Sequence, residues 1–414
     1  MQISAFLPLF ISGVGLFLLF ELRFFFLLHP VRTAREMLSA LKDKENRRSL
    51  CLALAGTLGV GNIFGVAAGI MIGGAGSLFW LLVSSVFSMV IKYAETLLAF
   101  DGVGERGGTS ITLKRLFPRH GKTLCMIYAI LTVLLSLFMG AALQSEALLD
   151  VAENTLSINP VMSALILLVL VMPCFVGGAA KIEKITEIII PLTTIIYIIM
   201  CFSVILINFS RLSDAVSCIV NSALSCRSFA GGVIPIAIRE GFSRGILSNE
   251  AGIGTSAAAH LRAKGRSPHI AGLFGILEVF FDSTLLCTLT GLSILVSVDN
   301  ISAFKTPMSL VLSAFTSGLG SFSGYIVLVL IFAFAYATVI CWYYYGSEFV
   351  SLYFSSFGRI FPIAYGLFLY LPAFFSASFT LYFTDVVILF MAILTLSAII
   401  KGKARIAELS QISD

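Results

Sequence analysis

Residues 239–260, REGFSRGILSNEAGIGTSAAAH, decide how the rest of this chain is organised. They belong to an apolar segment long enough to cross a bilayer, yet the middle of that segment is the polar, glycine-rich run SNEAGIG at 248–254. Exposed backbone and a carboxylate at membrane depth are tolerated only where protein or a watery cavity surrounds them. The sequence therefore predicts a membrane helix that is broken in its middle.

A second interruption of the same kind lies upstream, in AGTLGVGN at residues 55–62. Two glycine-interrupted membrane segments in corresponding positions of two halves of a chain indicate the substrate site of a secondary transporter. The two runs are therefore predicted to face each other in the middle of the membrane.

The composition is that of a polytopic membrane protein. Hydrophobic residues make up 58% of the 414 residues, charged residues only 12%, and the mean hydropathy is +1.01. Soluble domains contain far more charge. The first apolar run, residues 5–28, has no basic residue before it and no cleavage site after it, so we interpret it as a retained helix and not a signal peptide.

The eight cysteines are scattered and form no C-x-x-C pair, which indicates neither a metal site nor a disulfide framework. Cys218 and Cys226 share a predicted external loop and could form a bridge, although small apolar packing is the favoured interpretation for all eight. We interpret the net charge of +5 as an excess of basic residues in the loops on one side of the membrane, and not as a sign of nucleic-acid binding.

Windows of about 20 apolar residues predict eleven membrane spans. Most of the 27 Lys and Arg residues fall in alternate connections, beginning with residues 29–49, and in the tail from Lys401. The positive-inside rule then places the N-terminus outside and the C-terminus in the cytoplasm of a multi-pass plasma (inner) membrane protein. The predicted spans are 5–28, 50–72, 77–99, 123–149, 160–178, 188–209, 229–260, 270–297, 322–350, 360–377 and 379–400.

With the first span set aside, each broken segment is the first of a group of five spans. Because five is an odd number, the second group enters the membrane from the side opposite to the first. We therefore expect an all-α protein with an inverted repeat of five plus five helices and one extra N-terminal helix. Residues 301–317 form an amphipathic segment that is either an external lid or an ordinary connecting loop. The predicted units are the extra helix and its loop (1–49), the first repeat (50–209), the second repeat (210–400) and the cytoplasmic tail (401–414).

The glycines of the two breaks are candidates for ligand contact. A broken helix offers free N–H groups and a positive dipole end to a carboxylate, while its unwound carbonyls can face an ammonium group or a metal ion. Gly59, Gly61 and Gly65 fit this role in the first break, and Gly252 and Gly254 in the second. The alternative is that these small residues only let helices pack closely. The two asparagines and the glutamate beside them favour the site.

Intramembrane charges permit two interpretations. Glu278 and Asp282 are four residues apart on one helix face, where repulsion in a low dielectric would leave one of them protonated as part of a proton relay. The favoured alternative is that they cap half-helices or pair with Arg239 or Arg244, because buried charges are usually paired. Glu250 is expected to tie the unwound chain together.

Other polar residues of the spans are predicted to reach water. Lys92 lies near the cytoplasmic end of its span, where its side chain can extend to the interface. His120, His260 and His269 lie near cytoplasmic loops without ligand spacing, so we expect them to be solvated.

Several long motifs resemble the signatures of the alanine or glycine:cation symporters. They occur in the same order from the first helix to the last, which is far more specific than one glycine pattern. The resemblance implies a leucine-transporter-like fold, no enzymatic activity, and Na⁺-coupled uptake of a small neutral amino acid such as alanine or glycine. The motifs are GTLGVGNIFGVA (56–67), GGAG (73–76), KYAE (92–95), RGILSNEAGIG (244–254), LEVFFD (277–282) and WYYYG (342–346).

The same resemblance assigns roles to individual residues. Backbone N–H groups of Val60 and Gly61 would hold the substrate carboxylate, and Asn249 would face the ligand. The coupling Na⁺ would take the carbonyls of Ala55 and Leu58. Asn62 and the Thr338 hydroxyl complete the implied Na⁺ site, and the implied substrate-binding set is Gly59, Val60, Gly61, Phe64, Gln144, Asn249 and Gly252.

Four positions depart from that pattern. Val60 replaces Thr, Phe64 a small residue, Glu146 Asn, and Ala337 Ser. A ring at Phe64 would narrow the pocket and favour glycine or alanine over leucine, provided that it points inward. Alternatives to Na⁺-coupled symport are a proton-coupled or other-solute transporter of the same fold, or a substrate-sensing receptor on that scaffold. The oligomeric state is left open.

Overall fold

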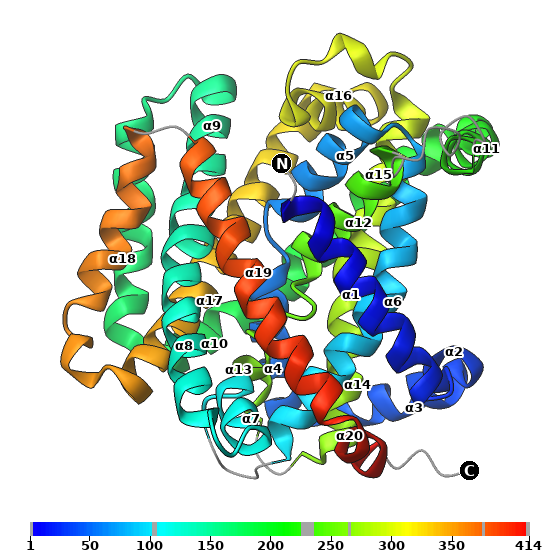
Figure 1. The fold of residues 1–414 in the computed structure, drawn as a ribbon. Helices are drawn as coiled ribbons and strands as arrows, with labels where there is room; N and C mark the ends of the chain where they lie inside the picture. The colour runs from blue at the N-terminus through cyan, green and yellow to red at the C-terminus, as the bar shows by residue number, and fades with distance from the viewer. Residues whose placement is uncertain (1–2, 102–105, 225–235, 264–265, 375–376, 411–414) are drawn as a thin grey trace.

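A computed structural model describes residues 3–101, 106–224, 236–263, 266–374 and 377–410. All regular secondary structure in these ranges is helical, which confirms the all-α prediction (Figure 1). Many large apolar side chains on the outside of the bundle are exposed, for example Val176 and Phe322. Such a surface suits lipid contact and not water.

Six described helical stretches are long and apolar enough to cross a membrane. A seventh is a bent pair, in which α4 (Lys44–Thr57) meets η1 (Gly61–Gly65) and α5 (Val66–Gly73) at 52°. The six are α6 (Gly76–Phe100); α8, η2 and α9 (Gly121–Leu135, Ser136–Leu143, Gln144–Leu156); α10 (Pro160–Ile207); α14, η5 and α15 (Pro268–Val279, Phe280–Cys287, Thr288–Ser297); α17 (Ser321–Tyr353); and most of α19 (Ala377–Lys401).

The predicted count of eleven spans is reproduced only in part. The segment around residue 250 is divided into α12 (Ile236–Asn249) and α13 (Ala257–His260), and neither piece alone spans a bilayer. The helix α1 (Ile3–Glu21) has 19 residues, but the apolar stretches described in α1 and around α18 (Phe361–Tyr370), Phe10–Glu21 and Phe361–Ala373, are shorter than a full span. The inverted repeat therefore stays a prediction.

One predicted connection is wrong. Residues 179–187 were expected to form a loop between two spans, but they are helical, so α10 consists of two helices and the second begins directly after Gly178, where the first span was predicted to end. The chain kinks inside α10 at Gly178, with φ 60° and ψ −165°. Glycine adopts this conformation without a side-chain clash. The chain therefore changes direction at one residue, and the residues on both sides of it stay helical.

Both predicted helix breaks are present. The first lies between Thr57, where α4 ends, and Gly61, where η1 begins. The second follows Asn249, because Glu250, Gly252 and Gly254 have φ of 55°, 83° and 84°, which a right-handed helix does not permit. It begins slightly later than expected, since Leu247 to Asn249 are still helical.

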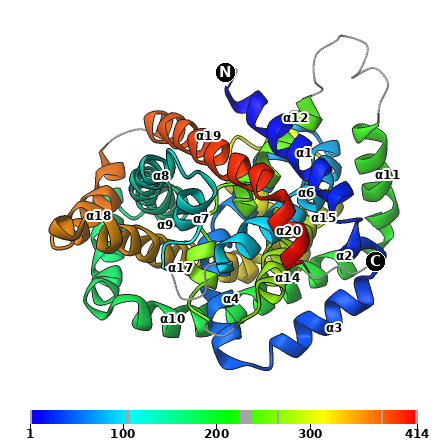
Figure 2. The same ribbon diagram turned by 60° about the horizontal axis from the view of Figure 1, so that its bottom comes forward.

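The helices are packed in two groups. On one side α12 and α14 pack along α6, with α1 and α19 nearby (Figures 1 and 2). On the other side α8, α10, α17 and α18 form a second layer around the first break. The cavity that concerns function lies between these groups.

The connections rich in Lys and Arg gather at one end of the bundle, which is the lower end in Figure 1. This end holds α3 (Pro30–Ala40), α7 (Thr109–Leu116), α13 and α20 (Lys403–Leu409), whereas α11 (Leu212–Ala223) and α16 (Pro307–Leu319) lie at the other end. The remaining short helices are α2 (Phe25–Leu28), η3 (Phe209–Arg211), η6 (Ile301–Ala303), η7 (Ser355–Phe357) and η8 (Leu371–Ala373).

Candidate functional site

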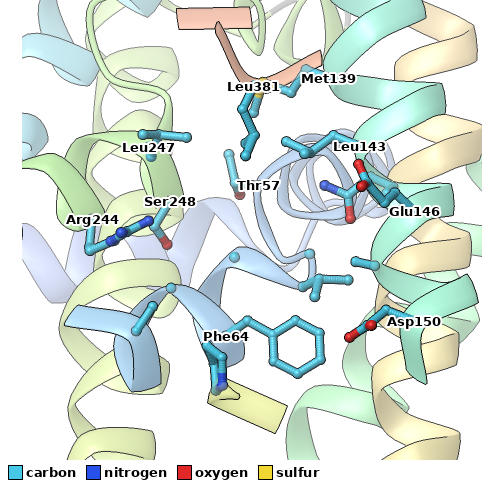
Figure 3. Close-up of a pocket in the computed structure, with 18 of the residues that line it drawn as sticks. Thr57, Phe64, Met139, Leu143, Glu146, Asp150, Arg244, Leu247, Ser248 and Leu381 are labelled. Atoms are coloured by element: carbon cyan, nitrogen blue, oxygen red, sulfur yellow. The ribbon is translucent and has the colours of Figure 1, made fainter. Parts of the chain in front are cut away.

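A cavity of about 550 Å³ lies between the two helix breaks (Figure 3). Its walls come from α4, η1 and α5, from η2 and α9, from α12, from the start of α16 and from α19. Cavities of this size hold small organic ligands. Its lining includes Gly59, Val60, Gly61, Phe64, Met139, Leu143, Gln144, Glu146, Asp150, Arg244, Leu247, Ser248, Glu250, Thr306, Met308 and Leu381.

The first break offers backbone groups to this cavity. A side chain at Gly59 would place its Cβ 2.9 Å from Thr338 Oγ1 and 3.3 Å from Gln144 Oε1, so only glycine fits there. The helix that restarts at Gly61 has no intrahelical partners for its first N–H groups, and its dipole is positive at that end. Val60 and Gly61 therefore border the cavity where a carboxylate would be stabilised.

Two side chains from the predicted substrate set also line the cavity. The ring of Phe64 points inward, between η1 and α9 (Figure 3). Gln144 is only 8% exposed, and its Oε1 has no hydrogen-bond partner among the described residues. The amide oxygen of Gln144 is therefore available to a ligand donor.

Asn249 and Gly252 were assigned to the same set but do not line the cavity. Asn249 Nδ2 donates to Ser283 Oγ at 3.0 Å, and Asn249 Oδ1 accepts from the N–H of Ala251 at 3.0 Å. The N–H of Gly252 donates to Glu95 Oε2 at 3.0 Å. Both residues fix the shape of the second break, because their polar groups are already used within the protein.

Thr338 lies against the first break, as the ion-site assignment requires. Its Oγ1 is 3.4 Å from the Leu58 carbonyl oxygen and 3.0 Å from that of Phe334. The N–H of Gly59 donates to the carbonyl oxygen of Thr57 at 2.8 Å. It therefore does not donate to the carbonyl oxygen of Ala55, which would be its partner in a regular α-helix. The break thus presents a hydroxyl beside backbone carbonyls that are not in regular helical bonds.

Asn62 belongs to a cluster centred on the buried carboxylate of Asp282. Asn62 Nδ2 donates to Asp282, which also accepts hydrogen bonds from Ser248 Oγ at 2.8 Å and Ser283 Oγ at 2.6 Å. Asn62 Oδ1 has no partner among the described residues. Asp282 therefore joins the first break to the end of α12 through η5.

A fully buried lysine holds the second break. Lys92 Nζ lies 3.3 Å from both Glu95 Oε1 and Glu278 Oε1, and it donates to Ser256 Oγ at 2.7 Å. His260 Nε2 is 2.9 Å from Glu278 Oε2. All of these side chains are shielded from water, so each charge depends on its neighbours for stabilisation.

Several sequence-based expectations about charges are therefore wrong. Lys92 does not extend to the interface, and His260 is not solvated. His269 is largely buried as well, with Nδ1 2.8 Å from Tyr93 Oη. The polarity of a residue and its distance from a loop in the sequence say little about its depth within a bundle, and all three side chains lie where helices meet.

The partners expected for the buried carboxylates were also wrong. Arg239 and Arg244 bind Glu240 at 3.0 and 3.2 Å and do not pair with Glu278 or Asp282. Glu278 is nevertheless paired, because it binds Lys92 and His260. Glu250 ties the unwound chain as expected, since its Oε2 accepts from Thr255 Oγ1 at 2.9 Å. The proposed bridge between Cys218 and Cys226 involves a residue outside the described ranges.

Comparison with known proteins assigns the chain to a family. The profile of the sodium:alanine symporter family matches residues 1–410. The chain belongs to this family. A transporter of Haemophilus influenzae with no assigned substrate is 30% identical over 96% of this chain and 91% of its own length. The sodium/alanine symporter AgcS of Methanococcus maripaludis is 31% identical over 81% of this chain and 78% of its own.

The fold of this symporter is shared with a solved structure. The crystal structure of MhsT in complex with L-phenylalanine has a TM-score of 0.65, with 13% sequence identity, over 89% of this chain and 92% of MhsT. This likeness supports the leucine-transporter fold and nothing about the ligand. The chain is thus a membrane transporter and not an enzyme.

Some residues around the symporter cavity were not among those predicted from the sequence. Asp150 follows Glu146 by four residues and lines the same wall, and the spacing could have revealed this shared face. Thr306 and Met308 at the start of α16 also border the cavity. They lie in the amphipathic segment whose role as lid or loop the sequence left open.

Proposed function

We propose that this symporter carries a small neutral amino acid, such as alanine or glycine, into the cell together with Na⁺ by alternating access. The observation that carries the proposal is one cavity bordered by both helix breaks. In this proposal the substrate carboxylate binds the N–H groups of Val60 and Gly61, beside Gly59. The substrate ammonium faces the Gln144 amide oxygen, and Phe64 limits the space for the side chain.

The Na⁺ site of the proposal lies at the first break. Na⁺ is a hard cation that must exchange its hydration oxygens for protein oxygens. The carbonyls of Ala55 and Leu58 and the hydroxyl of Thr338 supply them, and the 3.4 Å contact of Thr338 with Leu58 supports this assignment. Asn62 remains a candidate ligand through its unpartnered Oδ1.

The proposal includes the two inverted repeats, 50–209 and 210–400, preceded by the extra helix unit 1–49 and followed by the tail 401–414. Movement of one repeat relative to the other would open the cavity to each side in turn. The clustering of basic connections at one end supports a cytoplasmic location for that end, in the plasma (inner) membrane.

A counterflow assay in proteoliposomes tests the proposal. Vesicles loaded with unlabelled alanine should accumulate labelled alanine or glycine in Na⁺ buffer, and replacement of Na⁺ by K⁺ or choline should abolish accumulation. Binding of alanine without any accumulation would indicate a receptor and refute symport.

Proton coupling is the second candidate, and the buried acidic groups favour it. Glu95, Glu278 and Asp282 are all enclosed, with Lys92 as the one Lys or Arg side chain in direct contact with either glutamate among the described residues. In the same vesicles, uptake that persists in choline and follows an inward proton gradient would establish this alternative over Na⁺.

A further inference from the structure

We propose that α3 is a docking surface for anionic phospholipids, which bind along the exposed face formed by Val31, Arg35, Leu38 and Lys42. This inference goes beyond transport itself and does not depend on the substrate or the coupling ion of the cavity. The helix follows α1 and the short α2, and it lies at the end of the bundle that holds the basic connections. Figure 2 shows α3 along the outer edge of the bundle.

The outer face of α3 is apolar although the helix is no membrane span. Thr33 and Met37 are buried, whereas Val31 is 71% exposed and Leu38 is 66% exposed. Leu28, just before α3, is 67% exposed. The 11 residues of α3 extend only about 16 Å, too little to cross a bilayer. The exposed apolar side chains therefore reach hydrocarbon when α3 lies flat at the interface between lipid and water.

Two basic side chains share this face. Arg35 follows Val31 by four residues, and Lys42, just beyond the end of α3, follows Leu38 by four. Residues with this spacing lie on one side of a helix. An open groove of about 690 Å³ follows the face, and all four side chains line it. Apolar and basic groups thus alternate along one surface.

The acidic residues of the same connection do not neutralise the groove. Glu36 binds Arg32 at 3.0 Å and His269 at 3.2 Å. Asp43 caps α4, because its side chain accepts a backbone N–H of the first turn of that helix at 3.0 Å. Glu45 lies in the first turn of α4 and, like Glu36 and Asp43, is not among the described residues that line the groove. The described lining therefore carries positive charge without a carboxylate, which complements an anionic headgroup.

The combination of side chains indicates a lipid and not a soluble anion. Free phosphate can pair with Arg35 and Lys42 but gains nothing from Val31 and Leu38. An anionic phospholipid contacts both kinds of side chain, because its phosphate and its acyl chains are joined at the depth where an interfacial helix lies. The long stems of the basic residues can extend along the apolar surface while their charges reach the headgroups.

The inner side of α3 connects this surface to the helices around the second break. Glu36 Oε2 lies 3.2 Å from His269 Nε2 at the start of α14, and His269 Nδ1 lies 2.8 Å from Tyr93 Oη on α6. Met37 belongs to the same buried cluster as Tyr93. A lipid bound to α3 therefore fixes a helix that contacts both α6 and α14, and we expect it to raise the thermal stability of the protein.

The experiment titrates the purified full-length symporter in detergent with phosphatidylglycerol and measures the thermal midpoint. Phosphatidylcholine with the same acyl chains is the neutral comparison. Phosphatidylglycerol should raise the midpoint until the effect saturates, and phosphatidylcholine should not. Each basic residue near anionic lipid strengthens binding roughly fivefold. Arg35→Gln and Lys42→Gln should therefore each weaken the apparent affinity for phosphatidylglycerol about fivefold, and the double variant about 25-fold.

Lys114→Gln/Lys122→Gln is the matched control. Both lysines are exposed, on α7 and at the start of α8, and neither lines the groove. This control removes the same amount of charge and should leave the affinity within about twofold of wild type. Val31→Ser/Leu38→Ser keeps both basic residues of the groove and should weaken binding roughly tenfold, because the apolar contact is lost. The side chains replaced in all these variants are exposed, so the midpoints without lipid should match wild type.

Three outcomes of the titration would overturn the inference. One is a shift with phosphatidylglycerol that is absent or no larger than the shift with phosphatidylcholine. Another is an equal loss of affinity in Arg35→Gln/Lys42→Gln and in the matched control, which would show attraction by the whole basic end. The third is an equal shift with glycerol 3-phosphate, which has the charge but no acyl chains and would indicate a site for small anions.

Fluorescence of Leu38→Trp locates α3 without relying on stability. In nanodiscs that contain brominated phosphatidylglycerol, quenching should exceed that of the parent protein, in which Trp80 and Trp342 give the background. Quenching no greater than this background would place the outer face of α3 in water and contradict lipid docking. Alanine uptake by the same preparation reports on the proposed function separately.

Discussion

Phe64 and Thr338 are the two side chains whose replacement reports most directly on the site. Phe64 extends from η1 into the cavity, and Thr338 reaches from α17 to the carbonyl of Leu58. Ala337, next to Thr338, is fully buried and has no hydroxyl. Phe64 thus bears on substrate size and Thr338 on ion coupling, so variants of these two residues test separate parts of the proposal.

Phe64→Ala should widen the range of substrates. Removing the ring frees space for a larger side chain. We expect leucine to compete with labelled alanine roughly tenfold better in this variant than in wild type. Phe79→Ala is the control, because Phe79 packs on Trp80 outside the cavity. Equal competition by leucine in wild type and Phe64→Ala would show that another wall limits substrate size.

Thr338→Ala should abolish the Na⁺ dependence of uptake, and Ala337→Ser should tighten the apparent Na⁺ affinity, because the added hydroxyl supplies one more oxygen. Uptake is titrated with Na⁺ in each variant. Thr132→Ala serves as the control, since Thr132 is equally buried but donates to the carbonyl oxygen of Tyr128 at 2.9 Å and not to the first break. Identical Na⁺ curves for wild type and both variants would place the coupling ion elsewhere.

At the scale of the helices, the second break is held by its neighbours α6 and α14. Lys92 and Glu95 from α6 and Glu278 from α14 surround it, and Glu95 accepts the N–H of Gly252. The sequence predicted this break from its glycines and Glu250. It did not predict that Lys92 is enclosed there, because its contacts with Glu278 and Ser256 join residues more than 150 positions apart, and local periodicity carries no information about such contacts.

Lys92→Met should destabilise the protein strongly. It leaves two buried carboxylates without their cation, a loss of about 3–5 kcal/mol. The double variant Lys92→Met/Glu278→Gln should recover part of this loss, since one uncompensated charge is also removed. Lys114→Met is the control, because Lys114 is exposed. Thermal midpoints in detergent measure the effect, and a midpoint for Lys92→Met equal to that of the control would refute the role of Lys92.

For the whole molecule, the sequence predicted the helical class, the two breaks and the first-break lining from composition, glycine pattern and motifs. It did not predict that two helices of α10 meet directly at Gly178, whose non-helical backbone replaces the expected loop at 179–187. It also placed Asn249 at the ligand, whereas hydrogen bonds to Ser283 and Ala251 occupy its amide. Which face of a broken segment meets the cavity depends on tertiary packing.

The topology can be tested with thiol labelling in intact cells. Cys218 is exposed on α11, at the end of the bundle opposite α20. A membrane-impermeant maleimide should label Cys218 from outside. Lys403→Cys, made in a Cys218→Ser/Cys226→Ser background, should react only after permeabilisation. Labelling of Lys403→Cys in intact cells would reverse the orientation.

The buried ion pairs around Lys92 also determine which helices can separate at the lowest cost in free energy. Separating α6, α13 and α14 would remove the partners of Lys92 and Glu278, so these helices should move as one rigid body. The opposite wall of the cavity includes the apolar side chains of Leu143 and Met308, which can slide past a neighbour without separating an ion pair. In the proposed transport cycle we therefore expect α9 and α16 to move against a stationary group of α6, α13 and α14.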